Sequence, residues 1–312
     1  MNCLVQIIRF LRFKKFLACC NASDQKNMKL INKETVFEAL RKESCVSPGG
    51  ELKKEMLQKK VCAIVPAAGK GTRLDYDGPK VLFPYKGKTI LRVLYGVLED
   101  IAASFCLVIS PKHRKAIQQY LNSTGIDVIL AEQEQPTGMG DAILCARSGF
   151  SETEIENCDF VIVWGDQITV SKQTVLTTLL YHQFAAPESV LAFPTCRLDN
   201  PYIHFEKDEN CEITALYQKR EGDTMPETGE SDCGVFVVRG TTLFRHLETY
   251  KQEAESGAQT REFNFLPFIV WLADNGHKVV ALPIAEPVET RGINTKEDVD
   301  YIESTIDAES GN

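Results

Sequence analysis

The sequence lacks the features that mark several classes of protein. It has no run of about 18 uncharged apolar residues, which a membrane-spanning helix needs, and no internal repeat. Its 11 cysteines include no Cys-x-x-Cys pair. The formal net charge is −8, from 35 Lys and Arg against 43 Asp and Glu. Because nucleic-acid binding depends on neutralising phosphates, this acidity predicts no nucleic-acid partner, although a locally basic pocket can still bind a small anion.

The cysteines are scattered along the chain, and the five histidines form no metal-ligand spacing with them. An odd number of thiols without a framework is typical of a reducing compartment, so we expect a cytoplasmic protein. The composition, 44% hydrophobic and 25% charged, is that of an ordinary globular protein. A chain of 312 residues is long enough to bury a full core without disulfide bonds.

Residues 1–60 differ in composition from the rest and are predicted to form an N-terminal extension, partly helical or disordered. Residues 4–17 are apolar but are interrupted by four basic residues, and two cysteines follow directly afterwards at positions 19 and 20. One interpretation is a basic amphipathic helix that makes weak membrane-surface contact through residues 1–20. The other is an unstructured extension, or a protein whose translation begins at Met28.

From Val61 onward, short apolar strands alternate with helical stretches. The first strand is expected at Val61–Pro66 and the helix after it at Ile90–Ile101. This alternation predicts an α/β fold whose sheet is covered on both faces and, with right-handed crossovers, doubly wound. After Val190 the strands follow one another closely, which predicts a small β extension. We therefore expect one Rossmann-like domain over residues 61–307, with a mixed but mostly parallel sheet.

The remaining elements expected from this pattern are as follows. The strands are Phe105–Ser110, Asp127–Ala131, Phe160–Trp164, Val190–Pro194, Tyr202–Glu206, Glu212–Tyr217, Gly234–Arg239 and Lys278–Pro283. The helices are Lys112–Leu121, Met139–Ser148, Lys172–Phe184, Thr241–Tyr250, Phe263–Asn275 and a last one beginning near Asn294.

A glycine-rich loop follows the first strand, at the strand end where open α/β sheets bind ligands. It reads Ala67-Ala68-Gly69-Lys70-Gly71-Thr72-Arg73, with Lys80 a little further along the chain. The glycines let backbone N–H groups approach phosphate oxygens, and the cations can neutralise a triphosphate. The loop has neither the Gly-Lys-Ser/Thr of a Walker A motif nor the third glycine of the dinucleotide fingerprint. It predicts phosphate binding, with a plain strand-to-helix turn as the alternative.

Three further motifs follow in the sequence. They are Gln135-Pro136-Thr137-Gly138-Met139-Gly140, Trp164-Gly165-Asp166 and Gly292-Ile293-Asn294. Together with the glycine-rich loop, and in the same order, they resemble the motifs of the sugar-1-phosphate nucleotidylyltransferases. The likeness is strongest to the uridylyltransferase domain of the bacterial N-acetylglucosamine-1-phosphate uridyltransferases, and it spans residues 61–306.

The resemblance implies a nucleotidyltransferase fold, Mg²⁺ as cofactor and a role for each motif. It assigns Arg73 and Lys80 to catalysis and Asp166 and Asn294 to the metal ion. Nucleotide binding falls to Ala67, Ala68, Gly69, Gly71, Thr72, Gln133, Gln135, Gly138 and Met139. Sugar binding falls to Trp164, Tyr202, Gln218 and Asp232. The glutamine side chains carry paired donor and acceptor groups that suit a pyrimidine edge.

Three of these residues have a structural alternative. Asp166 stands before a helix that it would cap, and Trp164 is equally suited to a hydrophobic core. Asn294 is followed by Thr295-x-x-Asp298, a weak capping box, so it also fits a helix N-terminus.

The sequence thus predicts an enzyme that transfers a nucleotidyl group from a nucleoside triphosphate, UTP in our interpretation, to a sugar 1-phosphate and releases pyrophosphate. N-acetylglucosamine 1-phosphate is one candidate, but Gln218 and Asp232 replace a Glu and an Asn of the resembled enzymes, which leaves the sugar open. The alternatives are a nucleotidylyltransferase of the same fold for phosphocholine or a molybdopterin cofactor, and a non-catalytic regulatory relative. The oligomeric state is not predicted.

Overall fold

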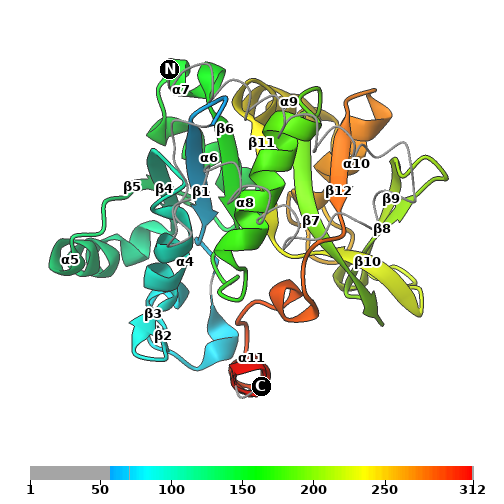
Figure 1. Cartoon of the computed structure of the whole chain (residues 1–312). Helices are drawn as coiled ribbons and strands as arrows, with labels where there is room; N and C mark the ends of the chain where they lie inside the picture. The colour runs from blue at the N-terminus through cyan, green and yellow to red at the C-terminus, as the bar shows by residue number, and fades with distance from the viewer. Residues whose placement is uncertain (1–56, 70, 311–312) are drawn as a thin grey trace, which may run out of the picture.

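The structure is a computed structural model that describes residues 57–69 and 71–310 (Figure 1). Residues 1–20, for which an amphipathic helix is one of two interpretations, and most of the expected N-terminal extension lie outside the described residues. Within the described ranges, no helix combines the length and apolar character that crossing a membrane requires.

One mixed sheet of eight strands forms the centre of the fold. Its first half is parallel: β1 (Val61–Pro66) lies between β4 (Ser104–Ile109) and β6 (Asp159–Val163), and β5 (Ile129–Glu132) lies beyond β4. These strands are short and almost wholly apolar because both of their faces are buried. The parallel core predicted from the sequence is confirmed.

The second half of the sheet is mixed. β11 (Val235–Arg239) runs antiparallel to both β6 and β7 (Leu191–Asp199), and β12 (Val279–Leu282) runs parallel to β7. Further along, β7 leaves β11 and pairs with β10 (Thr228–Asp232). The sequence did not predict β10, because Thr-Gly-Glu-Ser-Asp has almost none of the β-branched and aromatic residues typical of strands. It is extended because the far end of β7 offers it a partner.

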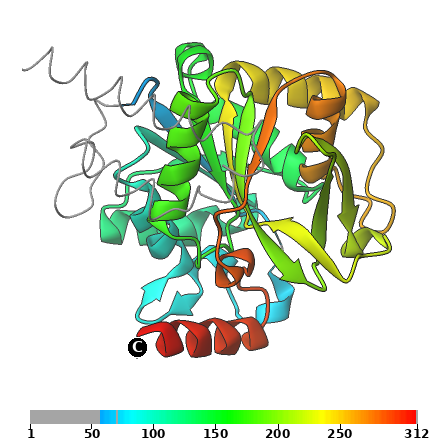
Figure 2. The ribbon, with the colours of Figure 1, turned by 45° about the vertical axis from the view of Figure 1, so that its right-hand side comes forward.

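The expected β extension is a hairpin of β8 (Ile203–Lys207) and β9 (Ile213–Gln218). It contacts β10 on one side and α10 (Leu266–Asp274) on the other, and Figure 2 shows it beside the main sheet. The last strand of this region therefore ends close to the loops that precede α10.

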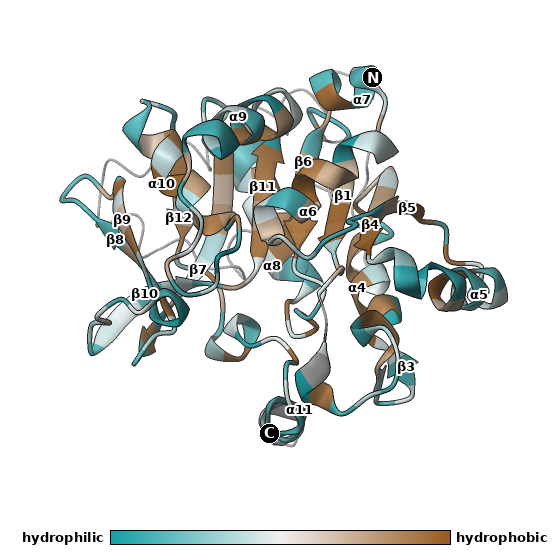
Figure 3. Cartoon of the chain, turned by 180° about the vertical axis from the view of Figure 1, so that it is seen from behind, coloured by the Kyte–Doolittle hydropathy of each residue, from teal (hydrophilic) through white to brown (hydrophobic). Residues whose placement is uncertain are grey.

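Helices cover both faces of the sheet, as the doubly wound pattern predicted. One face packs against α4 (Ile90–Leu98) and α8 (Lys172–Leu180), and α8 crosses it in Figure 1. The opposite face packs against α6 (Met139–Cys145), α9 (Gly240–Glu253) and α10, as Figure 3 shows from behind. Alternate residues of each strand point into the two cores. The other helices are α5 (Arg114–Thr124), α7 (Glu152–Asn157) and α11 (Lys296–Ser310).

The helix expected over 172–184 ends earlier than predicted. α8 stops at Leu180 and is followed by a π turn, Tyr181–Ala185. Within that turn the buried Gln183 accepts a hydrogen bond from the Gln58 amide at 3.0 Å and donates one to Asp159 Oδ2 at 2.9 Å. The π turn thereby satisfies polar groups where the chain enters the sheet, a tertiary requirement that helical periodicity does not encode.

A backbone contact fixes the loop that precedes α6. Phe263 N donates to Thr137 O at 2.7 Å, and Gly140 N donates to Phe263 O at 3.0 Å. Gly138, between them, has φ of +125°, and a Cβ added there would lie 2.5 Å from Phe263 O. Only glycine accommodates both this dihedral angle and this close approach. Gly138, which the resemblance assigns to nucleotide binding, thus allows the Phe263 backbone to approach.

We expect Gly138→Ala to destabilise the protein by about 2 kcal/mol or more, because it combines backbone strain with overpacking. The matched control is Gly96→Ala in α4, where an added Cβ meets only Glu99 Oε1 at 3.9 Å. That change should raise stability by about 0.5–1 kcal/mol through helix propensity. Thermal or denaturant unfolding of both variants measures the difference. Equal stability of the two variants would show that the Phe263 contact does not constrain the loop.

Candidate active site

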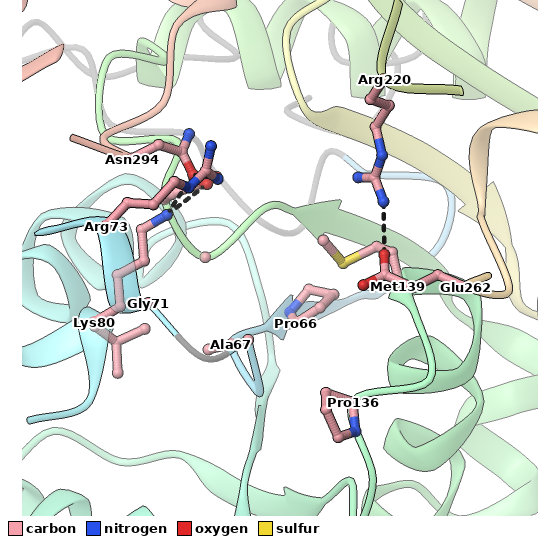
Figure 4. Close-up of a pocket in the computed structure, with 14 residues that line it drawn as sticks. Pro66, Ala67, Gly71, Arg73, Lys80, Pro136, Met139, Arg220, Glu262 and Asn294 are labelled. Atoms are coloured by element: carbon pink, nitrogen blue, oxygen red, sulfur yellow. Dashed lines mark hydrogen bonds and ion pairs between the residues drawn. The ribbon is translucent and has the colours of Figure 1, made fainter. Parts of the chain in front are cut away.

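A pocket of about 390 Å³ opens at the carboxyl ends of β1 and β6 (Figure 4). Residues from all four sequence motifs line it, although the first and the last motif are more than two hundred positions apart in the chain. Its lining comprises Pro66, Ala67, Gly69, Gly71, Arg73, Lys80, Val81, Pro136, Met139, Gly165, Asp166, Arg220, Glu262 and Asn294. Three cations and two carboxylates among them leave the pocket with a net positive charge in an otherwise acidic chain. This is the locally basic pocket that an anionic substrate requires.

Lys80 is the centre of a polar cluster in this pocket. Its Nζ donates to Asp166 Oδ2 at 2.8 Å and to Asn294 Oδ1 at 2.9 Å. Arg73 donates from Nη2 to the same Asn294 oxygen at 3.1 Å. The structure therefore brings together both residues expected to act in catalysis and both residues expected to hold a metal ion.

Asp166 is held by the segment that carries Asn294. Ile293 N donates to the Asp166 carbonyl at 2.9 Å, and a Cβ added to Gly292 would lie 2.9 Å from Asp166 Oδ1. The glycine of the Gly-Ile-Asn motif is thus needed for the two chain segments to meet. Asp166 does not cap the following helix, because Ser171 accepts the hydrogen bond at the N-terminus of α8.

Thr295, and not Asn294, is the N-cap residue of α11. Thr295 Oγ1 accepts from Asp298 N at 3.3 Å, and Asp298 Oδ2 accepts from Thr295 N at 2.9 Å, which is a reciprocal capping box. Thr295 therefore caps α11. This leaves the Asn294 side chain to face Lys80 and Arg73.

The expected nucleotide-binding residues fall into two groups. Of those that follow β1, Ala67, Gly69 and Gly71 line the pocket, Ala68 is buried beside it and Thr72 begins a short 3₁₀ turn, Thr72–Leu74. Of the residues in and before the 135–140 loop, Met139 lines the pocket, whereas Gln135 is exposed and Gly138 lies against Phe263.

Gln133, directly after β5, holds the 135–140 loop through hydrogen bonds of its side chain. Its side chain is buried, and its Nε2 donates to the Gly138 carbonyl at 3.0 Å and to Asp141 Oδ2 at 3.3 Å. Asp141 in turn accepts from Thr137 Oγ1 at 2.6 Å and pairs with Lys251 of α9 at 2.5 Å. Although burial raises the pKa of Asp141, its hydrogen bonds from Lys251, Thr137 and Gln133 lower the pKa below its usual value overall. A charged carboxylate thus ties the loop to α9.

The four residues expected to bind the sugar do not converge in the pocket. Trp164 packs its ring against Phe236 and Phe265, with ring centroids 4.9 and 5.7 Å apart, as its core alternative predicted. Tyr202 is 56% exposed, and Gln218 is buried at the end of β9.

Asp232, the fourth, is buried at the end of β10 and accepts from Gly234 N at 2.8 Å. Burial raises the pKa of its carboxyl to about 6. None of the four lines the pocket described above.

Two charged residues of the pocket were not predicted from the sequence. Arg220 and Glu262 form an ion pair, with Nη2 2.6 Å from Oε2, on the side of the pocket away from Lys80 (Figure 4). Both lie in short, charged segments that read as ordinary surface loops, and neither belongs to a recognisable motif. A signal would have required knowing that the turn after β9 and the loop before α10 meet.

The oxygen atoms around Lys80 suit a hard cation. Asp166 Oδ2 and Asn294 Oδ1 converge on one cationic atom, at 2.8 and 2.9 Å. In the described part of the chain, no group of three or more His, Cys, Asp or Glu side chains forms a metal site. One carboxylate and one amide oxygen are nevertheless the sparse protein contribution that Mg²⁺ accepts when substrate phosphates and waters complete its shell. The residues present therefore fit the ion that the motifs imply.

Comparison with known proteins places these residues in context. The bifunctional protein GlmU of Geotalea daltonii is 27% identical over 243 residues, which cover 76% of this chain and 50% of that protein. The GlmU protein of Zymomonas mobilis is 27% identical over 253 residues, which cover 79% of this chain and 53% of that protein. The chain thus spans about half the length of these curated relatives.

Solved structures share the fold. The CMP:2-keto-3-deoxy-manno-octonic acid synthetase complexed with CTP superposes with a TM-score of 0.58 at 16% identity, covering 80% of this chain and 99% of that one. The inositol-1-phosphate CTP transferase from T. maritima gives a TM-score of 0.56 at 18% identity, covering 79% and 98%. The nucleotidyltransferase fold expected from the motifs is confirmed.

The family follows from a match over most of the described chain. The model of the MobA-like NTP transferase domain matches residues 63–259, which include the glycine-rich loop, Lys80 and Asp166. The chain belongs to the family of MobA-like NTP transferase domains.

Proposed function

We propose that this protein transfers a nucleotidyl group from a nucleoside triphosphate to a sugar 1-phosphate and releases pyrophosphate. The observation that carries the proposal is the convergence of Arg73, Lys80, Asp166 and Asn294 in one pocket beside the glycine-rich loop. A regulatory relative without activity would have no need to keep this cluster intact. Membership of the NTP transferase family supports the same chemistry.

The reaction follows from the charges in the pocket. An oxygen of the acceptor phosphate attacks the α-phosphorus in line, a new P–O bond forms, and the bond to the β-phosphate oxygen breaks as pyrophosphate leaves. Lys80 and Arg73 offset the negative charge that gathers on the phosphate oxygens. The backbone of Ala67, Gly69 and Gly71 positions the triphosphate. No covalent enzyme intermediate is needed.

A metal ion is part of the proposal. Asp166 and Asn294 would hold Mg²⁺, which, when bound, supplies further neutralisation of the substrate phosphates. A metal ion held by Asp166 and Asn294 would leave the Lys80 ammonium to the substrate phosphates. In this structure Lys80 donates to both of these oxygens. Lys80 thereby stabilises the Asp166 carboxylate before substrate arrives.

The nucleotide is the finer part of the proposal. UTP is our candidate because the motifs most resemble those of a uridylyltransferase. Two structures of the same fold carry the names of CTP-using enzymes, which supports a pyrimidine and makes CTP the main rival.

The proposed setting is a reducing, cytoplasmic compartment. All seven cysteines in the described part of the chain are free thiols. Most of them are buried in the core, where a thiol packs as a small apolar group.

The direct test is a pyrophosphate-release screen of the four nucleoside triphosphates against phosphorylated acceptors, namely sugar 1-phosphates and phosphocholine. Turnover with a sugar 1-phosphate and not with phosphocholine supports the proposal. Turnover with phosphocholine alone moves the protein to another acceptor class, and pyrophosphate release from none of the pairs rejects it.

Lys80→Ala is expected to lower turnover by about 10²–10³, the scale for removing one preorganised charge-stabilising group. The fold should survive, because the Lys80 side chain lies at the pocket surface and not in either core. The matched control is Lys115→Ala on the exposed face of α5, for which we expect wild-type turnover. Steady-state rates and circular dichroism check both variants. A loss of tenfold or less would make Lys80 a surface charge.

Asp166→Asn should abolish most Mg²⁺-dependent turnover and raise the Mg²⁺ concentration that gives half-maximal rate. The isosteric change removes the charge but keeps the shape, so unfolding is not expected. Asp127→Asn, an exposed carboxylate near β5, serves as the control. Rates measured across a Mg²⁺ titration separate the two variants. An unchanged Mg²⁺ dependence in Asp166→Asn would remove this residue from the metal site.

For the nucleotide, we expect kcat/KM to be highest with UTP, with CTP second and both purine nucleotides lower by orders of magnitude. A site whose buried polar groups match one base leaves them unpaired with another, which lowers the rate. Measuring all four triphosphates with one accepted sugar phosphate decides the order. A clear preference for ATP or GTP would contradict the pyrimidine assignment.

A further inference from the structure

The pocket has a third cation, Arg220, outside the cluster formed by Lys80, Arg73, Asp166 and Asn294. Arg220 lies in the turn Lys219–Glu221 that follows β9, and its guanidinium reaches into the pocket from the side facing away from Lys80 (Figure 4). The proposed reaction uses Arg73, Lys80 and the metal ligands, and it gives Arg220 no part. A cation at the far side of the pocket therefore has no role in the reaction described so far.

The turn that carries Arg220 is firmly anchored by the next residue. Glu221 accepts from Thr260 Oγ1 at 2.6 Å, from Gln259 N at 2.9 Å and from Asn264 Nδ2 at 3.0 Å. Burial raises the pKa of the Glu221 carboxyl, but these hydrogen bonds outweigh it and lower the pKa to about 2. Glu221 therefore already ties the turn to the loop before α10, and the neighbouring Arg220–Glu262 pair is not needed for that purpose.

The Arg220–Glu262 pair itself adds little to stability. The two side chains are 36% and 38% exposed, and ion pairs at such positions contribute about 0–1 kcal/mol. Its geometry is more informative than its energy. At its place in the pocket, the guanidinium donates to Glu262 Oε2 at 2.6 Å, and its Nε lies 3.5 Å from Glu221 Oε1, so it already faces carboxylate oxygens.

We infer that Arg220 binds a second anionic group on the acceptor, a carboxylate or a phosphate at the end remote from the phosphate that reacts. This rests on the proposed function. The reacting phosphate belongs with Lys80 and Arg73, so an acceptor that spans the pocket presents its other end to Arg220. Glu262 accepts from the guanidinium in this structure and is displaced by the acceptor's anion. A guanidinium has five N–H donors and matches both carboxylate and phosphate groups.

This exchange of partners at Arg220 would also let the pocket distinguish anionic from neutral acceptors. A neutral acceptor leaves the Arg220–Glu262 pair in place and gains nothing from it. An anionic acceptor replaces one charge-assisted hydrogen bond with another inside the pocket and adds its own contacts. The acceptor class is therefore a sugar phosphate that carries a further negative charge.

Three acceptors with the same reacting end test the inference: glucose 1-phosphate, glucuronic acid 1-phosphate and glucose 1,6-bisphosphate. They differ only at carbon 6, which bears a hydroxyl, a carboxylate or a phosphate. Calorimetry measures their Kd values in the presence of Mg²⁺ and α,β-methylene UTP, so the result does not depend on turnover. We expect at least one anionic acceptor to bind about tenfold more tightly than glucose 1-phosphate, and the better of the two identifies the anion.

Variants separate binding from structure. Arg220→Gln should bring the ratio of anionic to neutral Kd values close to one, whereas Glu262→Gln should increase the anionic preference, because the competing carboxylate is gone. If the pair were only structural, both variants would change all three Kd values alike. Arg197→Gln, an exposed arginine that donates to Thr228 Oγ1 at 2.8 Å, is the control and should keep the wild-type ratio.

The outcomes separate this inference from the proposed function. Equal affinity of the wild-type protein for all three acceptors, or an anionic preference that survives Arg220→Gln, overturns the inference alone. If none of the three acceptors binds, the sugar 1-phosphate function falls and the inference falls with it.

Discussion

The pocket depends on one electrostatic contact, the ammonium of Lys80 between the oxygens of Asp166 and Asn294. Three chain segments meet there: the turn after the glycine-rich loop, the end of β6 and the segment before α11. If the Asp166 or Asn294 segment moved away, Lys80 would lose a hydrogen-bond acceptor, and Arg73 shares the Asn294 oxygen with it. The contact thus fixes the groups that we propose bind the substrates, and preorganised charge is what phosphoryl and nucleotidyl transfer require.

On the side of the pocket away from Lys80, the segment before α10 holds two other parts of the site. The loop at 135–140 is attached to Phe263, and the turn carrying Arg220 is attached through Glu221 to the same stretch before α10. One irregular segment, residues 257–264, therefore positions both the loop expected to face the base and the cation assigned to the acceptor. This coupling explains why a segment with no motif contributes to the site.

Much of this was predictable from the sequence. β1 has the bounds expected of an apolar strand, and the four motifs meet because strand ends share one edge of the sheet. What could not be predicted depends on tertiary pairing. β10 is a strand only because β7 extends far enough to pair with it. Gln133 is turned inward by its hydrogen bonds to the Gly138 carbonyl and the Asp141 carboxylate. Arg220 enters the pocket because its neighbour Glu221 is anchored to Thr260. Periodicity and motif spacing carry no information about such contacts.

The central claim is that the α-phosphorus is attacked and pyrophosphate leaves, and the fate of a label tests it most directly. The protein is given an accepted sugar phosphate with UTP labelled with ³²P at either the α or the γ position, and the products are separated. The account predicts that the α label appears in a product joined to the acceptor and that the γ label appears only in pyrophosphate. Transfer of the γ label to the acceptor would contradict it, because the pocket would then be that of a kinase.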